Sequence, residues 1–309
     1  MLRRILPATA AAVLLLAGVT GCSAQEAQAA DCSAKMQPGA LSDGTKVLGS
    51  FGEIPEISVP EDLSISSTQR TVVAEGEKDG RVAVEDSLVG VNMAFFAASG
   101  GDALYQSPGF DDPNAMPEML LVDEDAANPL SEAVRCSVPG DRVVLALSPE
   151  DSAQLGAQLG APTGDTLVGV IDVRTSSALR ATDGPVRGLP NGFPAVVTND
   201  EGQPGIVLPP TEAPEGMHSG VRIEGDGKVV QAGDAVIGHV LSVDWNGTIQ
   251  QNTWDSGVVM IGSQDDIEMS GNTFRTELTG AKVGSQVVIV EHESGGLARV
   301  VVVDIVGVN

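Results

Sequence analysis

The chain has 309 residues, which is long for one domain and typical of two. Hydrophobic residues make up 42% of it but aromatic residues only 3%, so we expect cores of Val, Ile, Leu and Ala, and the 37 Gly and 18 Pro favour short strands joined by turns. The formal net charge of −25 excludes a nucleic-acid partner, because phosphate binding needs a basic face, and it favours a soluble monomer.

Residues 1–21 predict a lipoprotein signal peptide. Two arginines at positions 3 and 4 precede the apolar stretch 5–18, which is too short and too early for an ordinary spanning helix, and small residues stand directly before Cys22. Cleavage there would leave Cys22 as an acylated N-terminus, followed by a lipidated tail over 22–44. The alternative is an ordinary signal peptide with a chance cysteine. We expect a lipid-anchored protein on the extracellular face of the cell membrane.

The two remaining cysteines, Cys32 and Cys136, predict a disulfide, since an exported chain meets an oxidising compartment. Two free thiols or a metal site are the alternatives. Without CxxC spacing or a neighbouring histidine, the pattern argues against a metal.

An internal repeat divides the rest of the chain into two copies. Four segments of the first copy recur in the same order in the second: 52–60, 73–76, 139–144 and 170–173 resemble 202–209, 222–225, 283–288 and 302–305. Gly52 matches Gly202, 150 residues on, whereas Asp172 matches Asp304, only 132 residues on. The second copy has therefore lost residues. We expect domains at 45–177 and 201–309, joined by a Pro- and Gly-containing linker over 178–200.

Each copy predicts mostly strands in an α+β arrangement. In chain order, the apolar and β-branched runs are 82–96, 142–147 and 167–173 in the first copy, and 229–243, 285–290 and 298–306 in the second. Each copy also has one short helical candidate, at 129–135 and at 272–279.

The second copy contains a series of short motifs in a fixed order: Glu224-Gly225-Asp226-Gly227, Gly233-Asp234, Gly238-His239-Val240, Trp245-Asn246-Gly247, Asn252-Thr253-Trp254-Asp255, the segment 274–285 and the closing Val302-Val303-Asp304-Ile305. These motifs, with the order of the elements, resemble the FKBP-type peptidyl-prolyl isomerases over roughly residues 45 to 309. The double-domain layout is similar to a group of actinobacterial FKBP-type lipoproteins. The resemblance implies two tandem FKBP-like domains, each a curved antiparallel sheet packed on one short helix.

The resemblance also implies an aromatic cup that twists an X-Pro amide, without nucleophile, metal or cofactor. Here the family's Tyr position is Val240, its Phe and Asp positions are Gln250 and Gln251, and its Trp floor is Phe274. The lid loop after Val290 is missing. Polar glutamines work against removing the amide from water, so we expect a degraded catalytic pocket in the second domain.

The first copy also lacks most of the aromatic residues of the family's cup. Met93 and Leu104 take the Tyr and Phe positions, and Tyr105 takes the Asp position. Phe95, Phe96, Tyr105 and Phe110 could form an apolar patch, although a plain core role is commoner for such residues.

Other catalytic or metal chemistry finds no support in the sequence. The three histidines, His218, His239 and His292, lack ligand spacing, and His239 on an apolar strand is typical of a packed core histidine. Asp123-Glu124-Asp125 lacks the Gly and closing Glu of a calcium loop, so a solvated turn is favoured.

Two functions therefore compete. One is an extracytoplasmic FKBP-type isomerase that assists exported polypeptides with X-Pro bonds. The other is a non-catalytic peptide- or protein-binding lipoprotein with a chaperone or scaffold role, which the lost cup favours. A solute-binding lipoprotein ranks last, since those proteins need a larger chain and an aromatic-lined cleft.

Overall fold

The structure is a computed structural model that describes residues 32–308, except 62, 77–79, 101, 113–114, 124, 126–127, 183, 201 and 293–295. The predicted signal peptide and the lipidation site Cys22 lie outside the described residues, as does Glu124. In the part of the chain that the structure describes, no helix is both long enough and apolar enough to cross a membrane.

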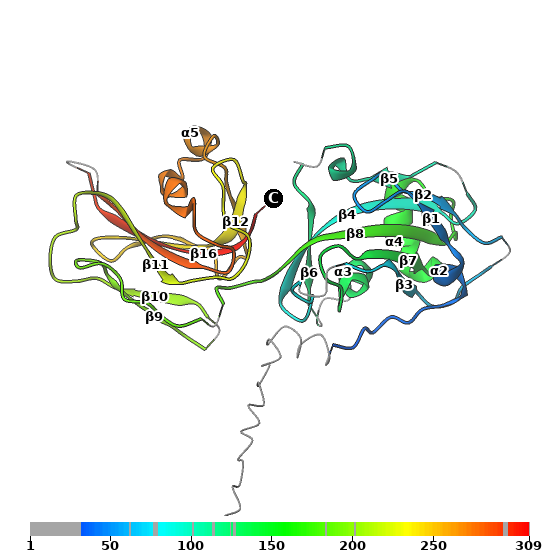
Figure 1. The fold of residues 1–309 in the computed structure, drawn as a ribbon, viewed down its shortest axis with the longest axis horizontal. Helices are drawn as coiled ribbons and strands as arrows, with labels where there is room; N and C mark the ends of the chain where they lie inside the picture. The colour runs from blue at the N-terminus through cyan, green and yellow to red at the C-terminus, as the bar shows by residue number, and fades with distance from the viewer. Residues whose placement is uncertain are drawn as a thin grey trace, which may run out of the picture.

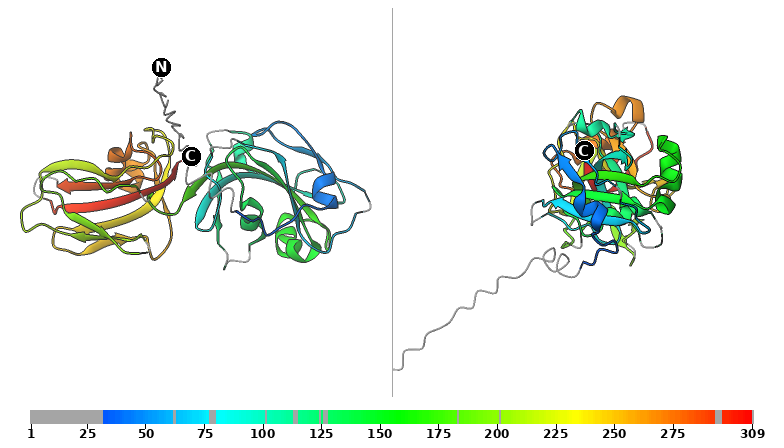
Figure 2. Two further views of the ribbon diagram at one scale, coloured as in Figure 1. Left: turned by 60° about the horizontal axis from the view of Figure 1, so that its bottom comes forward. Right: turned by 90° about the vertical axis from the view of Figure 1, so that its right-hand side faces the viewer.

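Two six-stranded antiparallel sheets form two lobes that lie side by side (Figure 1, Figure 2). The first sheet consists of β3 (Gln69–Ala74), β4 (Ser87–Ala97), β5 (Tyr105–Gln106), β6 (Glu118–Val122), β7 (Arg142–Leu147) and β8 (Leu167–Ala178). The second consists of β11 (Gly216–Ile223), β12 (Val236–Asp244), β13 (Ile249–Asn252), β14 (Val259–Gly262), β15 (Gln286–His292) and β16 (Arg299–Val308).

Both sheets have the same strand order, so the two copies of the sequence repeat correspond to two domains of the same topology. The first runs β3-β7-β8-β4-β5 with β6 also on β4, and the second runs β11-β15-β16-β12-β13 with β14 also on β12. The register shift where β4 meets β8, at Gly90/Val91, recurs where β12 meets β16, at Ile237/Gly238. The two copies thus share topology as well as sequence pattern.

A two-stranded hairpin precedes each sheet. β1 (Lys46–Leu48) pairs with β2 (Glu56–Ser58), and β9 (Ala195–Thr198) pairs with β10 (Pro204–Val207). The matched glycines Gly52 and Gly202 both have φ near +85°, at 83° and 86°, which explains why a glycine recurs in each turn. β9 lies inside the segment 178–200, so part of the expected linker is ordered strand.

The predicted strands are present but begin later than expected in two places. The runs 82–96 and 229–243 contain β4 and β12, which begin only at Ser87 and Val236. Asp86 adopts a left-handed φ of 58° and forms a turn before β4, and a turn at 232–234 precedes β12. Apolar runs cannot reveal such turns.

The helices differ more from expectation. α3 (Pro129–Val134) is present, and the second candidate is a 3₁₀ helix, η2 (Thr273–Leu278). The expectation of one short helix per domain missed α4 (Pro149–Leu159) between β7 and β8. In the second copy the described residues form no helix between β15 and β16, and the shorter connection, 293–298 instead of 148–166, accounts for the residues that this copy has lost. Further short elements are α2 (Ala40–Gly44), η1 (Pro108–Phe110) and α5 (Ile267–Ser270).

Local signals explain α4. Ser148 caps its N-terminus by accepting the backbone N–H of Asp151 at 3.2 Å, Pro149 occupies the first turn, and Gly160 ends it with a left-handed φ of 78°. Leu155 and Leu159 pack against the first core.

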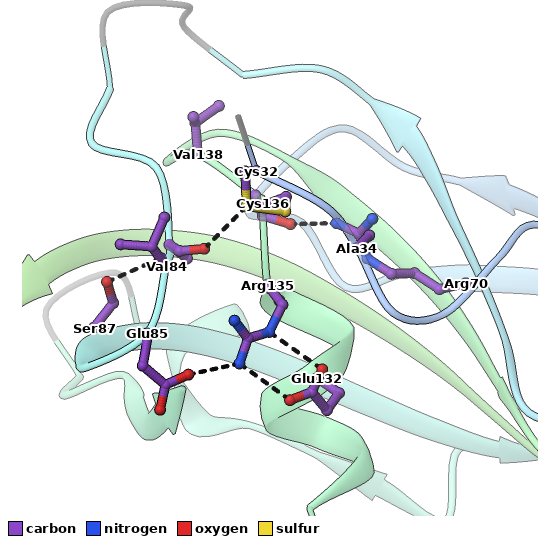
Figure 3. The surroundings of a disulfide bond; sticks show 12 residues. Cys32, Ala34, Arg70, Val84, Glu85, Ser87, Glu132, Arg135, Cys136 and Val138 are labelled. Atoms are coloured by element: carbon purple, nitrogen blue, oxygen red, sulfur yellow. Dashed lines mark hydrogen bonds and ion pairs between the residues drawn. A yellow bond between two sulfur atoms is a disulfide. The ribbon is translucent and has the colours of Figure 1, made fainter. Parts of the chain in front are cut away.

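The expected disulfide joins Cys32 to Cys136, with 5.6 Å between the Cα atoms and a sequence separation of 104 (Figure 3). Cys136 follows α3 and adopts a left-handed φ of 65°. Beside it, Arg135 bridges Glu132 and Glu85, at 3.2 and 2.8 Å. The bond fastens the segment before α2 to the sheet of the first domain.

The two domains are in direct contact. Leu88 of the first domain packs with Ile237 and Val306 of the second in one buried cluster. The connecting segment is tied down as well: the backbone N–H of Ala181 donates to the Asp304 carboxylate at 2.9 Å, and that of Thr182 donates to the carbonyl of Gly284 at 2.9 Å. These contacts fix the surfaces that face each other between the lobes.

Candidate functional site

The four cup positions of the second domain divide between a buried cluster and an exposed edge strand. Val240 on β12 and Phe274 on η2 belong to one core cluster, and their exposed fractions are only 1% and 2%. Gln250 and Gln251 on the edge strand β13 are exposed to solvent. The Gln250 amide donates to the carboxylate of Asp244 at 3.2 Å. The structure therefore brings Val240 and Phe274 together in the core and places Gln250 and Gln251 on an exposed edge strand.

The ring of Phe274 is covered by a side chain of the same domain. The guanidinium carbon of Arg299 lies 6.0 Å from the ring centroid, within range of a cation–π contact. Arg299 is held there by an ion pair with Glu291 and by a 3.0 Å hydrogen bond to the Thr273 hydroxyl. An amide approaching Phe274 would meet a charged group instead of a dry apolar wall.

In the first domain the aromatic residues divide between two clusters instead of forming one patch. Met93 and Phe95 point into the main core with Leu104 and Tyr105 at its edge, whereas Phe96 and Phe110 pack in a separate small cluster. Successive residues of β4 face opposite sides of the sheet, which produces this division.

Tyr105 does retain a polar contact. Its hydroxyl donates to Glu118, and burial together with that carboxylate raises the pKa of the phenol.

His239 on β12 is buried, with only 6% of its surface exposed. Its ring stacks on Trp254, with centroids 4.3 Å apart and an interplanar angle of 17°. Its Nδ1 lies 3.2 Å from the Thr253 hydroxyl, and burial lowers the pKa of the imidazole. His218 and His292 are elsewhere on β11 and β15. The three histidines are thus not brought together.

Sequence reasoning missed a pair of buried carboxylates at matched positions of the last strands. In the first domain Asp172 forms a buried ion pair with Arg142, with oxygen–nitrogen distances of 2.6 and 2.8 Å. At the matched place in the second domain, Asp304 accepts from the amide of Gln286 at 2.8 Å. With a neutral amide in place of the arginine, burial raises the pKa of Asp304 to about 6.

Asp304 should make the stability of the second domain depend on pH. Its pKa is raised from 3.8 in the unfolded chain to about 6, so the stabilisation is full below pH 3.8 and is lost as pH rises through 6. The loss amounts to about 3 kcal/mol. We expect the difference in unfolding free energy between the native chain and Asp304→Asn to change by that amount between about pH 4 and pH 7.

The measurement is urea unfolding followed by tryptophan fluorescence. The chain has two tryptophans, Trp245 and Trp254, and both lie in the second domain, so the signal reports that domain and, through Trp254, its contact with the first. A pH-independent difference between the two proteins would show that the Asp304 carboxyl titrates equally in the folded and unfolded states.

A hollow lies between the two domains. A groove of about 1310 Å³ is lined from the first domain by Leu88 and Leu121 and from the second by His239, Trp254 and Val258. A smaller cavity of about 340 Å³ shares Arg81 and Arg180 with it and is lined further by Ser176. No sequence signal within either copy could reveal this cleft, because neither domain forms it alone.

Fold and site together define a class of protein: a tandem pair of related antiparallel-sheet domains, with closed cores and a cleft between them. No protein-family model and no curated protein matches the sequence.

Among solved structures, the chain is similar to the three FKBP domains of wheat FKBP73, at 14% identity over 79% of this chain and 95% of that one, with a TM-score of 0.34. It is also similar to the N-terminal domain of FKBP42 from Arabidopsis thaliana, at 12% identity over 40% and 96% with a TM-score of 0.29. FkpA from Escherichia coli is similar at 19% identity over 35% and 47%, with a TM-score of 0.28. These scores do not by themselves establish a shared fold.

Proposed function

We propose that the chain is an exported, lipid-anchored protein of the FKBP type that binds polypeptide and does not catalyse prolyl isomerisation. Two observations support the family. The motifs of the second copy follow the family's order, and the two sheets repeat one strand order with matched hairpins and bulges. A repeat conserved at this level argues for one domain type used twice.

The covered ring of Phe274 carries the non-catalytic part of the proposal. An X-Pro bond rotates over a barrier of about 20 kcal/mol, and an enzyme lowers it only by binding the twisted amide better than the planar one. That requires an open, apolar cup. Here Val240 and Phe274 are core residues, Arg299 covers the ring, and the glutamines face water.

The disulfide supports the exported location. The bond between Cys32 and Cys136 requires an oxidising compartment to persist, and a signal peptide with Cys22 at its end would deliver the chain to one. The acylated Cys22 would then hold both domains at the outer face of the membrane, where unfolded exported polypeptides emerge.

The test is prolyl isomerisation of the peptide Ala-Leu-Pro-Phe, measured by NMR exchange between its cis and trans signals in the presence of the purified full chain. We expect the uncatalysed rate, with interconversion over tens of seconds or longer, at every protein concentration. Acceleration that grows with the concentration of folded protein would make the chain an isomerase and overturn the proposal.

If acceleration is observed, two variants show which domain is responsible for it. Met93→Ala would remove it if the first domain were responsible, and Arg299→Ala would raise it if the covering guanidinium were the only obstacle at Phe274. Without acceleration in either variant, polypeptide binding remains the function to pursue.

A further inference from the structure

Arg81 has no polar partner among the described residues, although the protein is acidic. The chain has 42 Asp and Glu for 17 Lys and Arg, yet among the described residues Arg81 makes no ion pair and no hydrogen bond. Its Nε–H is buried from solvent without an acceptor. A buried donor without an acceptor is rare in folded proteins, because burial removes it from water with nothing in exchange. The unpaired Nε–H of Arg81 therefore points to an acceptor supplied by a ligand.

A second unsatisfied group lies in the same cavity. The hydroxyl of Ser176, on β8, is buried and has no hydrogen-bond partner among the described residues. Arg81 and Ser176 both line the cavity of about 340 Å³ between the domains, together with Thr182 and Gly284. Two unpartnered donors facing one cavity match the two oxygens of a carboxylate better than a single neutral acceptor.

The cavity opens into a groove suited to a peptide chain. The groove of about 1310 Å³ is lined by Arg81, by the aliphatic side chains of Leu88, Leu121 and Val258, and by the partly buried ring of Trp254. The indole is fixed in place by stacking on His239. Rigid, partly exposed tryptophans and adjoining aliphatic side chains are typical surfaces for apolar side chains of a ligand.

Acidic side chains around the groove limit where an anion can bind. Glu85 and Glu224 are paired with Arg135 and with Arg187 and Lys282. The groove is also lined by Asp86, Asp200 and Asp226, whose negative charges would repel a bound carboxylate. In the smaller cavity, however, Arg81 and Arg180 face Asp226 alone among acidic residues, so positive charge predominates at that end.

We propose that the cleft between the domains binds an extended peptide, with a carboxylate at Arg81 and Ser176 and apolar side chains against Trp254. The inference rests on the proposed polypeptide-binding function and gives that function its site and its ligand chemistry. It also gives the tandem arrangement a purpose, since Arg81 and Ser176 come from the first domain and Trp254 from the second.

The experiment compares two pools of random heptapeptides, one with free C-terminal carboxylates and one with C-terminal amides, for retention by the full chain in equilibrium dialysis. We expect the carboxylate pool to bind about tenfold more tightly, since a charge-assisted, bidentate contact is the strong kind. Arg81→Met should abolish the difference, and Ser176→Ala should reduce it. Arg174→Met is the matched control, because Arg174 lies on the same strand as Ser176 and lines neither hollow.

Each outcome decides between the claims, provided that thermal unfolding shows Arg81→Met to be folded. Equal binding of both pools, or an undiminished preference in Arg81→Met, would overturn the carboxylate site while leaving polypeptide binding intact. If neither pool is retained by the native chain, the proposed function itself fails. Loss of the preference in Arg174→Met as well would show a general charge effect and would also overturn the site.

Discussion

Replacing Arg275 with methionine is expected to lower the unfolding free energy of the second domain by about 3–5 kcal/mol. Arg275 is fully buried, and burial lowers the pKa of its guanidinium. Its donors bind the carbonyl oxygens of Gly262, Gln231 and Asp234 at 2.7, 2.9 and 2.8 Å. Methionine fills a similar volume but leaves these carbonyls without donors in a dry interior, and the turns before β12 and after β14 lose their common anchor.

Urea unfolding of the full chain, followed by tryptophan fluorescence, measures this loss. Arg187→Met is the matched control: Arg187 is exposed and paired only at the surface, so its replacement should change the unfolding free energy by less than about 1 kcal/mol. Equal, small effects of the two substitutions would mean that Arg275 does not organise the second domain in this way.

Removing the disulfide by Cys32→Ala and Cys136→Ala together should lower the unfolding free energy of the first domain by about 4–5 kcal/mol, the effect expected for a loop of this length. The bond closes a loop between residues 104 apart in sequence. It also helps to hold Cys136 in a left-handed conformation, which residues other than glycine rarely adopt.

Circular dichroism follows the unfolding of both domains, and tryptophan fluorescence follows the second domain and its contact with the first, so the chain provides its own control. The unfolding transition of the first domain, seen by circular dichroism, should move to lower urea concentration. The transition seen by tryptophan fluorescence should keep its midpoint. If the fluorescence transition shifted equally, the bond would be stabilising the contact between the domains instead of the first domain. If neither moved, the segment from Cys32 would contribute nothing to the fold.

The sequence predicted the parts of the fold that depend on local pattern. The run 142–147 matches β7 residue for residue. Its Val and Leu residues favour a strand, and the Gly turn before it and the Ser cap after it set where the strand begins and ends. The matched glycines 52 and 202 identified equivalent hairpins, because both need a positive φ. α4 was missed although Ser148, Pro149 and Gly160 are recognisable start and stop signals. Attention to caps, and not only to apolar periodicity, would have found it.

The candidate site was less predictable, since it depends on contacts between distant segments. The family resemblance placed Gln250 and Gln251 in a cup, but β13 is an edge strand whose side chains reach solvent. Nothing in the sequence near Arg299 shows that its side chain covers Phe274. The cleft depends on contacts between the domains, such as the hydrogen bonds of Ala181 and Thr182 to Asp304 and Gly284, which join residues more than a hundred positions apart.

The central claim, that polypeptide binds between the domains and not at the family's cup, is tested most directly by the two indole N–H signals in an NMR titration. Trp254 lines the cleft, whereas the Trp245 indole donates to the carbonyl of Thr211 and lines neither hollow. Adding the carboxylate heptapeptide pool should shift the Trp254 signal and leave the Trp245 signal unchanged. Shifts confined to the methyl and ring signals of Val240 and Phe274, with Trp254 unmoved, would contradict the claim and restore the cup as the binding site.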